Sequence, residues 1–211
     1  TPIVWDSVDS ISHLFTQASQ QSRSLKGKLM TRLELQRTQR VEATLPCVFD
    51  RVLVTSSVDR TAFINLSARP EFVRRRIQVV PNGVDTDYFT PAATQSATQM
   101  LVVSGKMSYH ANVSMVLYLI EKIMPLVWQR NPNAVVQVVG KDPTREIKAL
   151  AGDPRITVTG SVPDMRPYLQ QAALAVSPIT YGTGIQNKVF EARVWEPSLI
   201  SYAVFFLKKN V

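Results

Sequence analysis

Four apolar runs in the second half of the chain constrain its fold more than any other feature. Each run is free of charged residues, and segments of helical composition separate one run from the next. The runs are residues 99–105, 134–140, 156–160 and 174–179. Strands that are apolar throughout and alternate with helices are typical of a parallel sheet covered on both faces. We therefore predict a doubly wound α/β domain whose ligand binds at the carboxyl ends of the strands, namely Gly105, Gly140, Gly160 and the 180–184 turn.

The segments between these runs supply the expected helices. Residues 112–130 predict the longest of them, residues 143–152 a short one, and residues 164–172 a third with Asp164 as its N-cap. The apolar face of the longest helix would consist of Val113, Val116, Leu117, Ile120, Ile123, Met124 and Val127.

The first half of the chain predicts a smaller α/β arrangement. We expect a strand at Ile3–Trp5, a basic helix over 22–42 with Glu34 and Glu42 among its basic residues, and a strand, turn and helix over 49–66. The polar residues 93–98 have the composition of a linker. We accordingly divide the chain into residues 1–92, residues 93–192 and a tail at 193–211.

Composition limits the chemistry available to the chain. Among 211 residues there is one cysteine, Cys47, so an internal disulfide or a thiol cluster for a metal is excluded. His13 and His110 are the only histidines, and neither has carboxylates at metal-ligand spacing, so we expect both to be packed or solvated and expect no metal site. No signal peptide and no run of about 20 apolar residues is evident. We therefore expect a cytoplasmic protein.

The net charge of +8 favours polyanionic partners without choosing among them. The basic features of the first half are Arg74–Arg76 and the helix over 22–42, which indicate either a solvated charged face or a surface that contacts the inner face of an anionic membrane. No aromatic residues interleave the arginines to stack on bases, so we do not expect nucleic-acid binding.

The stretch "YGTGIQNKVFEA" reads as a glycine-rich loop that leads into a helix. Gly182 and Gly184 allow a ligand close to the backbone, and the helix N-terminus favours an anion. Lys188 could reach a diphosphate oxygen, and Glu191, three residues on, could accept hydrogen bonds from ribose hydroxyls. The simpler alternative is a Lys–Glu pair on an exposed helix.

These motifs, taken in order, resemble one family. "VVPNGVD", "GKMSYHANV", "ITVTGSVPDMRPYL" and "SPITYGTGIQNKVFEA" are similar to the C-terminal half of retaining GT-B glycosyltransferases of family 4, especially the bacterial transferases of exopolysaccharide synthesis. "DSVDS" and "FDRVLVTSSVDR" resemble the end of that family's N-terminal domain. The resemblance covers residues 1–192. It implies an incomplete acceptor-side Rossmann-like domain followed by a donor-binding one.

The resemblance also implies a reaction and roles for residues. Such enzymes transfer a sugar from a nucleotide-diphosphate sugar to a glycan or lipid-linked acceptor, generally without a metal or other cofactor. Glu191 would bind the ribose and Lys188 the diphosphate, while Thr183 stands where many members have a second acidic residue. The donor-binding positions implied are Gly105, Lys106, Gly140, Val162, Gly182, Gly184 and Ile185. For "SGKMSYHAN" a plain strand–helix turn remains the alternative, and the spacing of a P-loop is missing.

After Ala192 the family pattern stops, and "RVWEPSLISYAVFFLKKNV" fits neither the helix end nor the next strand. We expect a frameshift near codon 193, a donor sheet without its last strands and a chain shortened at both ends, with impaired activity. Two alternatives stay open. One is a non-catalytic fragment that binds a nucleotide diphosphate or an anionic membrane, and the other is a GT-B relative with different chemistry, such as a nucleotide-sugar epimerase.

Overall fold

The chain forms two compact α/β units. The computed structural model describes residues 1–21, 25–89, 99–179 and Lys188. Unit 1 contains residues 1–82, and unit 2 begins at Gly83 and contains the remaining described residues. The units therefore separate ten residues earlier than the predicted boundary at 92, and the predicted linker at 93–98 lies outside the described residues.

Unit 1 is built on a parallel sheet of three strands. These are β1 (Val4–Val8), β2 (Arg51–Val54) and β3 (Ile77–Val79), in the order β1-β2-β3. Helices follow β1 and β2 in sequence, namely α1 (Ile11–Gln21), α2 (Leu25–Val48), α3 (Ser57–Leu66) and α4 (Pro70–Arg74). The side chains of Val52 and Val54 on β2 pack in one cluster with those of Phe63 and Val73, and all four are fully buried. The strand, turn and helix predicted over 49–66 are confirmed.

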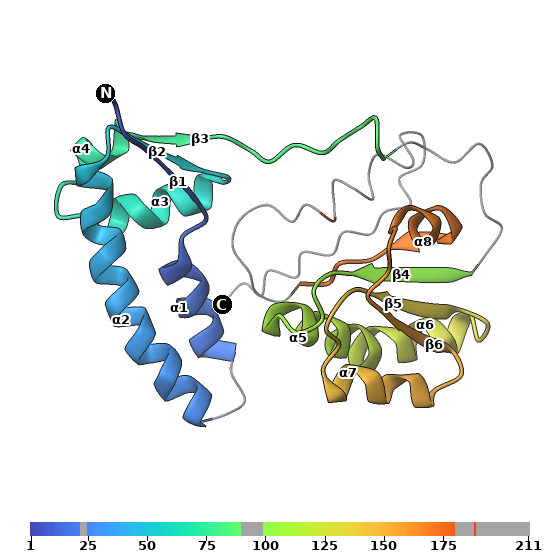
Figure 1. Cartoon of the computed structure of the whole chain (residues 1–211). Helices are drawn as coiled ribbons and strands as arrows, with labels where there is room; N and C mark the ends of the chain where they lie inside the picture. The colour runs from blue at the N-terminus through green and yellow to red at the C-terminus, as the bar shows by residue number, and fades with distance from the viewer. Residues whose placement is uncertain (22–24, 90–98, 180–187, 189–211) are drawn as a thin grey trace. The chain divides into compact units, whose positions relative to one another are not determined.

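α1 and α2 pack side by side (Figure 1), and a buried carboxylate joins them. Glu42 of α2 is only 4% exposed and lies at the N-terminus of α1. Its Oε1 accepts a hydrogen bond of 2.7 Å from the N–H of Ile11, and its Oε2 accepts one of 2.9 Å from the hydroxyl of Ser10. The N–H and hydroxyl of Ser12 also donate to it. Glu42 thus caps α1, whereas the sequence placed it only among the basic residues of its own helix.

Replacement of Glu42 by glutamine is expected to lower the free energy of unfolding by about 1 kcal/mol, because charge-assisted hydrogen bonds become neutral ones. Glu34 on the same helix is the matched control. It pairs with Arg37 at 3.3 Å in solvent, where an ion pair contributes little. Urea unfolding of Glu42→Gln and Glu34→Gln measures the difference. Equal stability of the two variants would refute the capping role.

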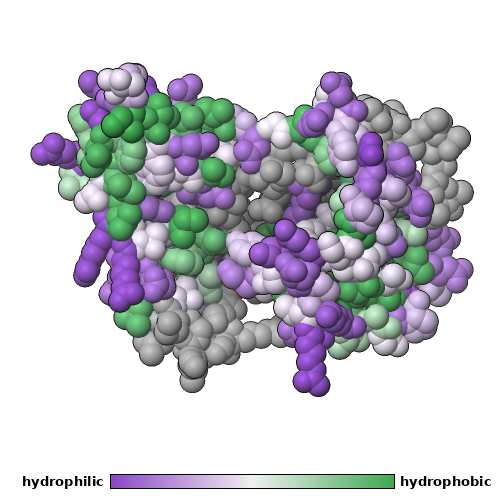
Figure 2. Space-filling model, viewed as in Figure 1, coloured by the Kyte–Doolittle hydropathy of each residue, from purple (hydrophilic) through white to green (hydrophobic). Residues whose placement is uncertain are grey.

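One face of β1 is not covered by the described residues. Val4 and Val8 are 52% and 43% exposed, whereas Trp5 between them packs on Phe63 and Phe49 in the core. Figure 2 shows hydrophobic residues on the visible face of unit 1, over the part that contains β1 and α4. The exposed apolar face at this edge agrees with the expectation of an incomplete sheet in the first half of the chain.

Unit 2 contains the predicted parallel sheet. Its strands are β4 (Met100–Ser104), β5 (Val135–Val139), β6 (Ile156–Gly160) and β7 (Leu174–Ala175), in the order β6-β5-β4-β7 and all parallel. Successive residues Val102 and Val103 point to opposite faces, and both are buried. The apolar runs are therefore explained by cover on both faces, as the sequence predicted.

Helices lie on both sides of this sheet (Figure 1). One face is covered by α5 (His110–Tyr118), η1 (Leu119–Ile123), α6 (Met124–Arg130) and α7 (Arg145–Ala149), the last continued by η2 (Leu150–Gly152). The other face is covered by α8 (Arg166–Gln171), whose Leu169 packs on Val102 and Val139. This arrangement confirms the prediction of a doubly wound α/β domain in the second half of the chain.

The long helix over His110–Arg130 differs from its prediction in which residues it buries. Met115 and Leu119 are fully buried although the predicted apolar face omitted them. Ala111, Met115 and Leu119 are buried at the ordinary helical spacing of four residues, so the buried stripe of α5 lies beside the predicted face. The π-helical segment η1 then makes the next buried residue Met124, five residues after Leu119.

The same helix is long and apolar enough to cross a membrane, by length and composition alone. The sequence showed no uninterrupted apolar run there, because Glu121 and Lys122 lie within the helix. The core helix of an α/β domain passes the same test. Here Met115, Val116, Leu119 and Met124 are buried against the sheet of unit 2.

The start of unit 2 docks on α8, which explains where the units separate. Phe89 packs in the apolar cluster under α8. The hydroxyl of Tyr88 donates a 3.2 Å hydrogen bond to Asp164, and the guanidinium of Arg166 lies 4.2 Å from the centre of the Tyr88 ring. Met165 occupies the N-cap position of α8, for which the sequence predicted Asp164, and makes no side-chain capping bond. Asp164, one residue earlier, accepts from the N–H and the side chain of Arg166, so its carboxylate bonds the first N–H of the helix.

This arrangement lowers the pKa of Asp164 from 3.8 to about 2, chiefly through the hydrogen bonds from Arg166. Because the ionised carboxylate is favoured in the folded chain, the pair supports folding above pH of about 4 and loses that effect as the pH falls to about 2. We expect Arg166→Gln to raise the pKa of Asp164 toward its ordinary value, as measured by carbon NMR. Arg155→Gln is the matched control, since Arg155 lowers the pKa of Asp153 in the same way. An unchanged Asp164 titration in Arg166→Gln would contradict this account.

Candidate functional site at the glycine edge of unit 2

Three glycines meet at the carboxyl edge of the sheet in unit 2. Gly105 follows β4, Gly140 follows β5, and Gly160 ends β6. The N–H of Gly105 donates to the carbonyl of Val139 at 3.1 Å, and the N–H of Gly140 donates to the carbonyl of Gly160 at 3.1 Å. All three have positive φ, of 148°, 150° and 73° in chain order. The predicted strand ends therefore lie together, and we call these three residues the glycine edge.

Protein packing accounts for two of these glycines. A Cβ on Gly140 would lie 1.8 Å from the carbonyl oxygen of Gly105, and a Cβ on Gly105 would lie 2.7 Å from Nδ2 of Asn112. A Cβ on Gly160 would meet nothing within 4 Å among the described residues. Gly105 and Gly140 are thus required by the close approach of neighbouring chain segments, as the plain-turn alternative expects. Their predicted contact with a ligand stays a prediction.

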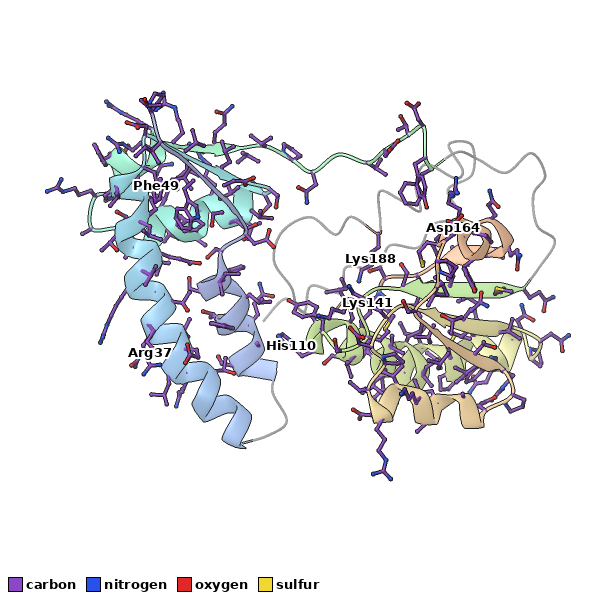
Figure 3. All side chains as sticks on the ribbon, viewed as in Figure 1. Arg37, Phe49, His110, Lys141, Asp164 and Lys188 are labelled. Atoms are coloured by element: carbon purple, nitrogen blue, oxygen red, sulfur yellow. The ribbon has the colours of Figure 1, made fainter. Side chains whose placement is uncertain are left out.

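The structure brings Lys188 to this edge. Its Nζ donates a 2.8 Å hydrogen bond to Oδ1 of Asn112 and lies 3.7 Å from the sulfur of Met115, both on α5. Figure 3 shows the side chain of Lys188 pointing toward the start of this helix. Because the amide of Asn112 also packs against Gly105, the ammonium lies beside the carboxyl end of β4. Asn112 thus lies between Lys188 and Gly105, and Gly105 contacts Gly140 in turn. The predicted roles of these residues in donor binding stay predictions.

Two other predicted donor-binding residues have different settings. Lys106 is exposed, and its carbonyl accepts hydrogen bonds from the N–H of Tyr109 at 3.1 Å and from Nδ2 of Asn112 at 3.0 Å. The side chain of Val162 packs in the cluster under α8, so its backbone alone is left for the predicted contact with a base. Four predicted residues lie outside the described part of the chain, namely Glu191, Gly182, Gly184 and Ile185.

Asn112 is the site residue that sequence reasoning missed. It is only 7% exposed, although it stands in the first turn of an apolar helix. Burial of a polar amide requires hydrogen-bond partners, and here Lys106 and Lys188 supply them. The available signal was an asparagine in "HANVSMV" where the helix should turn toward the core.

The two histidines lie on helices, His13 partly buried and His110 exposed. His13 shares a 2.8 Å hydrogen bond with Gln17 one turn later on α1. His110 begins α5, and its ring centre lies 4.7 Å from that of Tyr109. Among the described residues, no three His, Cys, Asp or Glu side chains gather in a group that could hold a metal ion. Independence from a metal stays a prediction.

This geometry suits a small anion. An ammonium group lies where parallel strands end and where a helix begins, and ligands of open α/β sheets bind in such places. A flexible lysine acts on phosphate as a compact point charge with three donors. The described edge can therefore neutralise negative charge that lies close to the backbone.

A comparison with known families decides the relationship. A family model described as "Glycosyl transferases group 1" matches residues 98–204, slightly more than half of the chain. The chain belongs to this family. The match covers the whole described sheet of unit 2 and runs past residue 192, into the segment that we had set apart as a tail. No curated protein matches the chain by sequence.

Solved glycosyltransferase structures resemble the chain at low identity. HepE of Anabaena in complex with UDP-glucose is 16% identical, with a TM-score of 0.63 over 92% of this chain and 51% of that one. Sucrose-phosphate synthase of Thermosynechococcus elongatus is 18% identical, with a TM-score of 0.58 over 90% and 47%. TarM is 13% identical, with a TM-score of 0.60 over 75% and 30%, and it comes from S. aureus.

These structures have the GT-B fold, and this chain shares it. The chain spans about half of their length or less. The activity, the substrates and the partners of the whole protein are accordingly proposals.

Proposed function

We propose that this chain is part of a retaining glycosyltransferase that takes a nucleotide-diphosphate sugar as donor. Unit 2 would bind the donor and unit 1 would belong to the acceptor side, with a glycan or a lipid-linked sugar as acceptor. The observation that carries the proposal is the ammonium of Lys188 beside the glycine edge. Membership of glycosyl transferases group 1 supports it.

In this reaction the bond between the anomeric carbon and the diphosphate oxygen breaks, and the oxygen of an acceptor hydroxyl forms the new bond to that carbon. The hydroxyl proton passes to the departing diphosphate or to solvent. Negative charge builds up on the departing diphosphate, so a nearby ammonium stabilises the transition state more than the ground state. Lys188 would supply this charge, and Glu191 would accept hydrogen bonds from the ribose. We propose that no metal or other cofactor takes part.

The donor's nucleotide is proposed from the similar structures. HepE was solved with UDP-glucose and TarM with UDP. A uracil nucleotide is therefore the first candidate for this chain, and GDP is the comparison. We further propose, from the sequence resemblance, a role in exopolysaccharide synthesis of a bacterium, in the cytoplasm and at the inner face of the membrane.

Calorimetric titration of the chain with UDP, GDP and the matching nucleosides tests the proposal. We expect one nucleoside diphosphate to bind and its nucleoside to bind far more weakly, because the diphosphate is the group that meets Lys188. Incubation with UDP-glucose then separates a transferase from a binder by release of UDP. Binding without release would favour the non-catalytic fragment, and failure of both diphosphates to bind would reject donor binding by this chain.

A further inference from the structure

Asn112 has no assigned role, yet it contacts Gly105 of the glycine edge and bonds both Lys106 and Lys188. We propose that Asn112 is a positioning residue that holds the ammonium of Lys188 toward the donor diphosphate. The inference rests on the proposed function for its ligand. The hydrogen bond between Asn112 and Lys188 is present in the ligand-free chain, so it can be tested without any nucleotide.

The two ends of the Asn112 amide have different partners. Its Nδ2 donates to the carbonyl of Lys106 at 3.0 Å, and its Oδ1 accepts from Nζ of Lys188 at 2.8 Å. A carbonyl can only accept and an ammonium can only donate, so these partners fix the orientation of the amide. Lys188 lies 76 residues away in sequence, so Asn112 connects the turn after β4 to a residue far along the chain.

Gly105 provides the space in which the amide lies. A side chain at Gly105 would meet Nδ2 of Asn112 at 2.7 Å and its Cγ at 3.0 Å. Because Asn112 is 7% exposed and bonded at both ends, it cannot move aside without breaking one of its hydrogen bonds. Glycine at position 105 therefore leaves the room that the side chain of Asn112 occupies.

The chemistry of an amide suits this task better than that of a carboxylate. A neutral oxygen accepts one ammonium proton without itself adding a negative charge that would compete with a phosphate for the ammonium. An aspartate at this position would pair with the ammonium and compete with the phosphate. It would also set a carboxylate oxygen against the carbonyl of Lys106, since it has no proton to donate there.

The first experiment measures Lys188 in the ligand-free chain. Trace acetylation followed by mass spectrometry reports the reactivity of each lysine amine. We expect Asn112→Ala to increase labelling of Lys188 several-fold, since the ammonium loses a hydrogen-bond acceptor, and Asn112→Asp to decrease it. Lys148 on α7 is exposed and serves as the internal control. The isosteric aspartate keeps the test usable if the alanine variant does not fold.

The second experiment measures UDP affinity in a double-mutant cycle with Lys188→Met. We expect Asn112→Ala to weaken UDP binding about 3- to 10-fold in the wild-type background and to have no effect in the Lys188→Met background. A residue with a merely structural role would weaken binding equally in both backgrounds.

Each outcome decides a separate point. Unchanged labelling of Lys188 in both Asn112 variants overturns the inference, whatever the nucleotide does. Equal losses of UDP affinity in the two backgrounds also overturn it. Altered labelling with unaltered UDP affinity would leave the hold on Lys188 standing and reject instead the proposed role of Lys188 in donor binding.

Discussion

Alanine at position 140 is expected to destabilise unit 2 by about 3 kcal/mol or more, or to prevent its folding. The new Cβ would lie 1.8 Å from the carbonyl oxygen of Gly105, well inside van der Waals contact. The backbone there has φ of +150°, a region that side chains disfavour. Relief would require β4 and β5 to separate where the N–H of Gly105 bonds the carbonyl of Val139.

Gly152→Ala is the matched control, because a Cβ there meets nothing within 4 Å of the described residues and no positive φ is required. Because the added methyl group has room, we expect Gly152→Ala to change the free energy of unfolding by less than about 1 kcal/mol. Urea unfolding of both variants gives the comparison. If Gly140→Ala unfolds at the same urea concentration as Gly152→Ala, the close contact between the strand ends is not as described.

Methionine at position 188 is expected to weaken UDP binding roughly 10- to 100-fold, since hydrogen bonds between charged partners contribute about 1.5–3 kcal/mol. Methionine is unbranched and of similar length, so it can keep the contact with Met115 while removing the charge. The affinity for uridine should stay unchanged, because uridine lacks the diphosphate. Calorimetry measures both ligands.

Lys148→Met removes the same charge from an exposed position on α7 and controls for the overall field of the chain. We expect it to change UDP affinity by less than about twofold at physiological ionic strength, where distant surface charges are screened. Equal losses in the two variants would show that UDP responds to net charge and not to the ammonium at the glycine edge.

The sheet of unit 2 was predictable because its signal is local. Runs such as "LVVS" and "VVQVV" are apolar at successive positions, and only burial on both faces explains that pattern. The meeting of Gly105 with Gly140 then follows from the parallel pairing of β4 with β5, whereas the order of the four strands was not predicted. The relation to glycosyltransferases came from several motifs read together and was confirmed at the level of the family.

The misses involve partners that are distant in sequence or a changed helical period. Glu42 bonds Ile11 from 31 residues away, and Asn112 bonds Lys188 from 76 residues away, so no spacing rule indicates either contact. Met115 and Leu119 were missed because the predicted apolar face was placed beside the buried one, and the π-helical segment changes the period only after Leu119. Of the residues at the candidate site, the sequence singled out Lys188 and Gly105, whose predicted roles stay predictions, but not the amide of Asn112 between them.

A crystal structure of the chain with UDP tests the central claim most directly. The account predicts diphosphate oxygens within hydrogen-bond distance of Nζ of Lys188, beside Gly105 and the start of α5. A nucleotide bound elsewhere, or a diphosphate at the glycine edge with Lys188 turned away from it, would contradict the account.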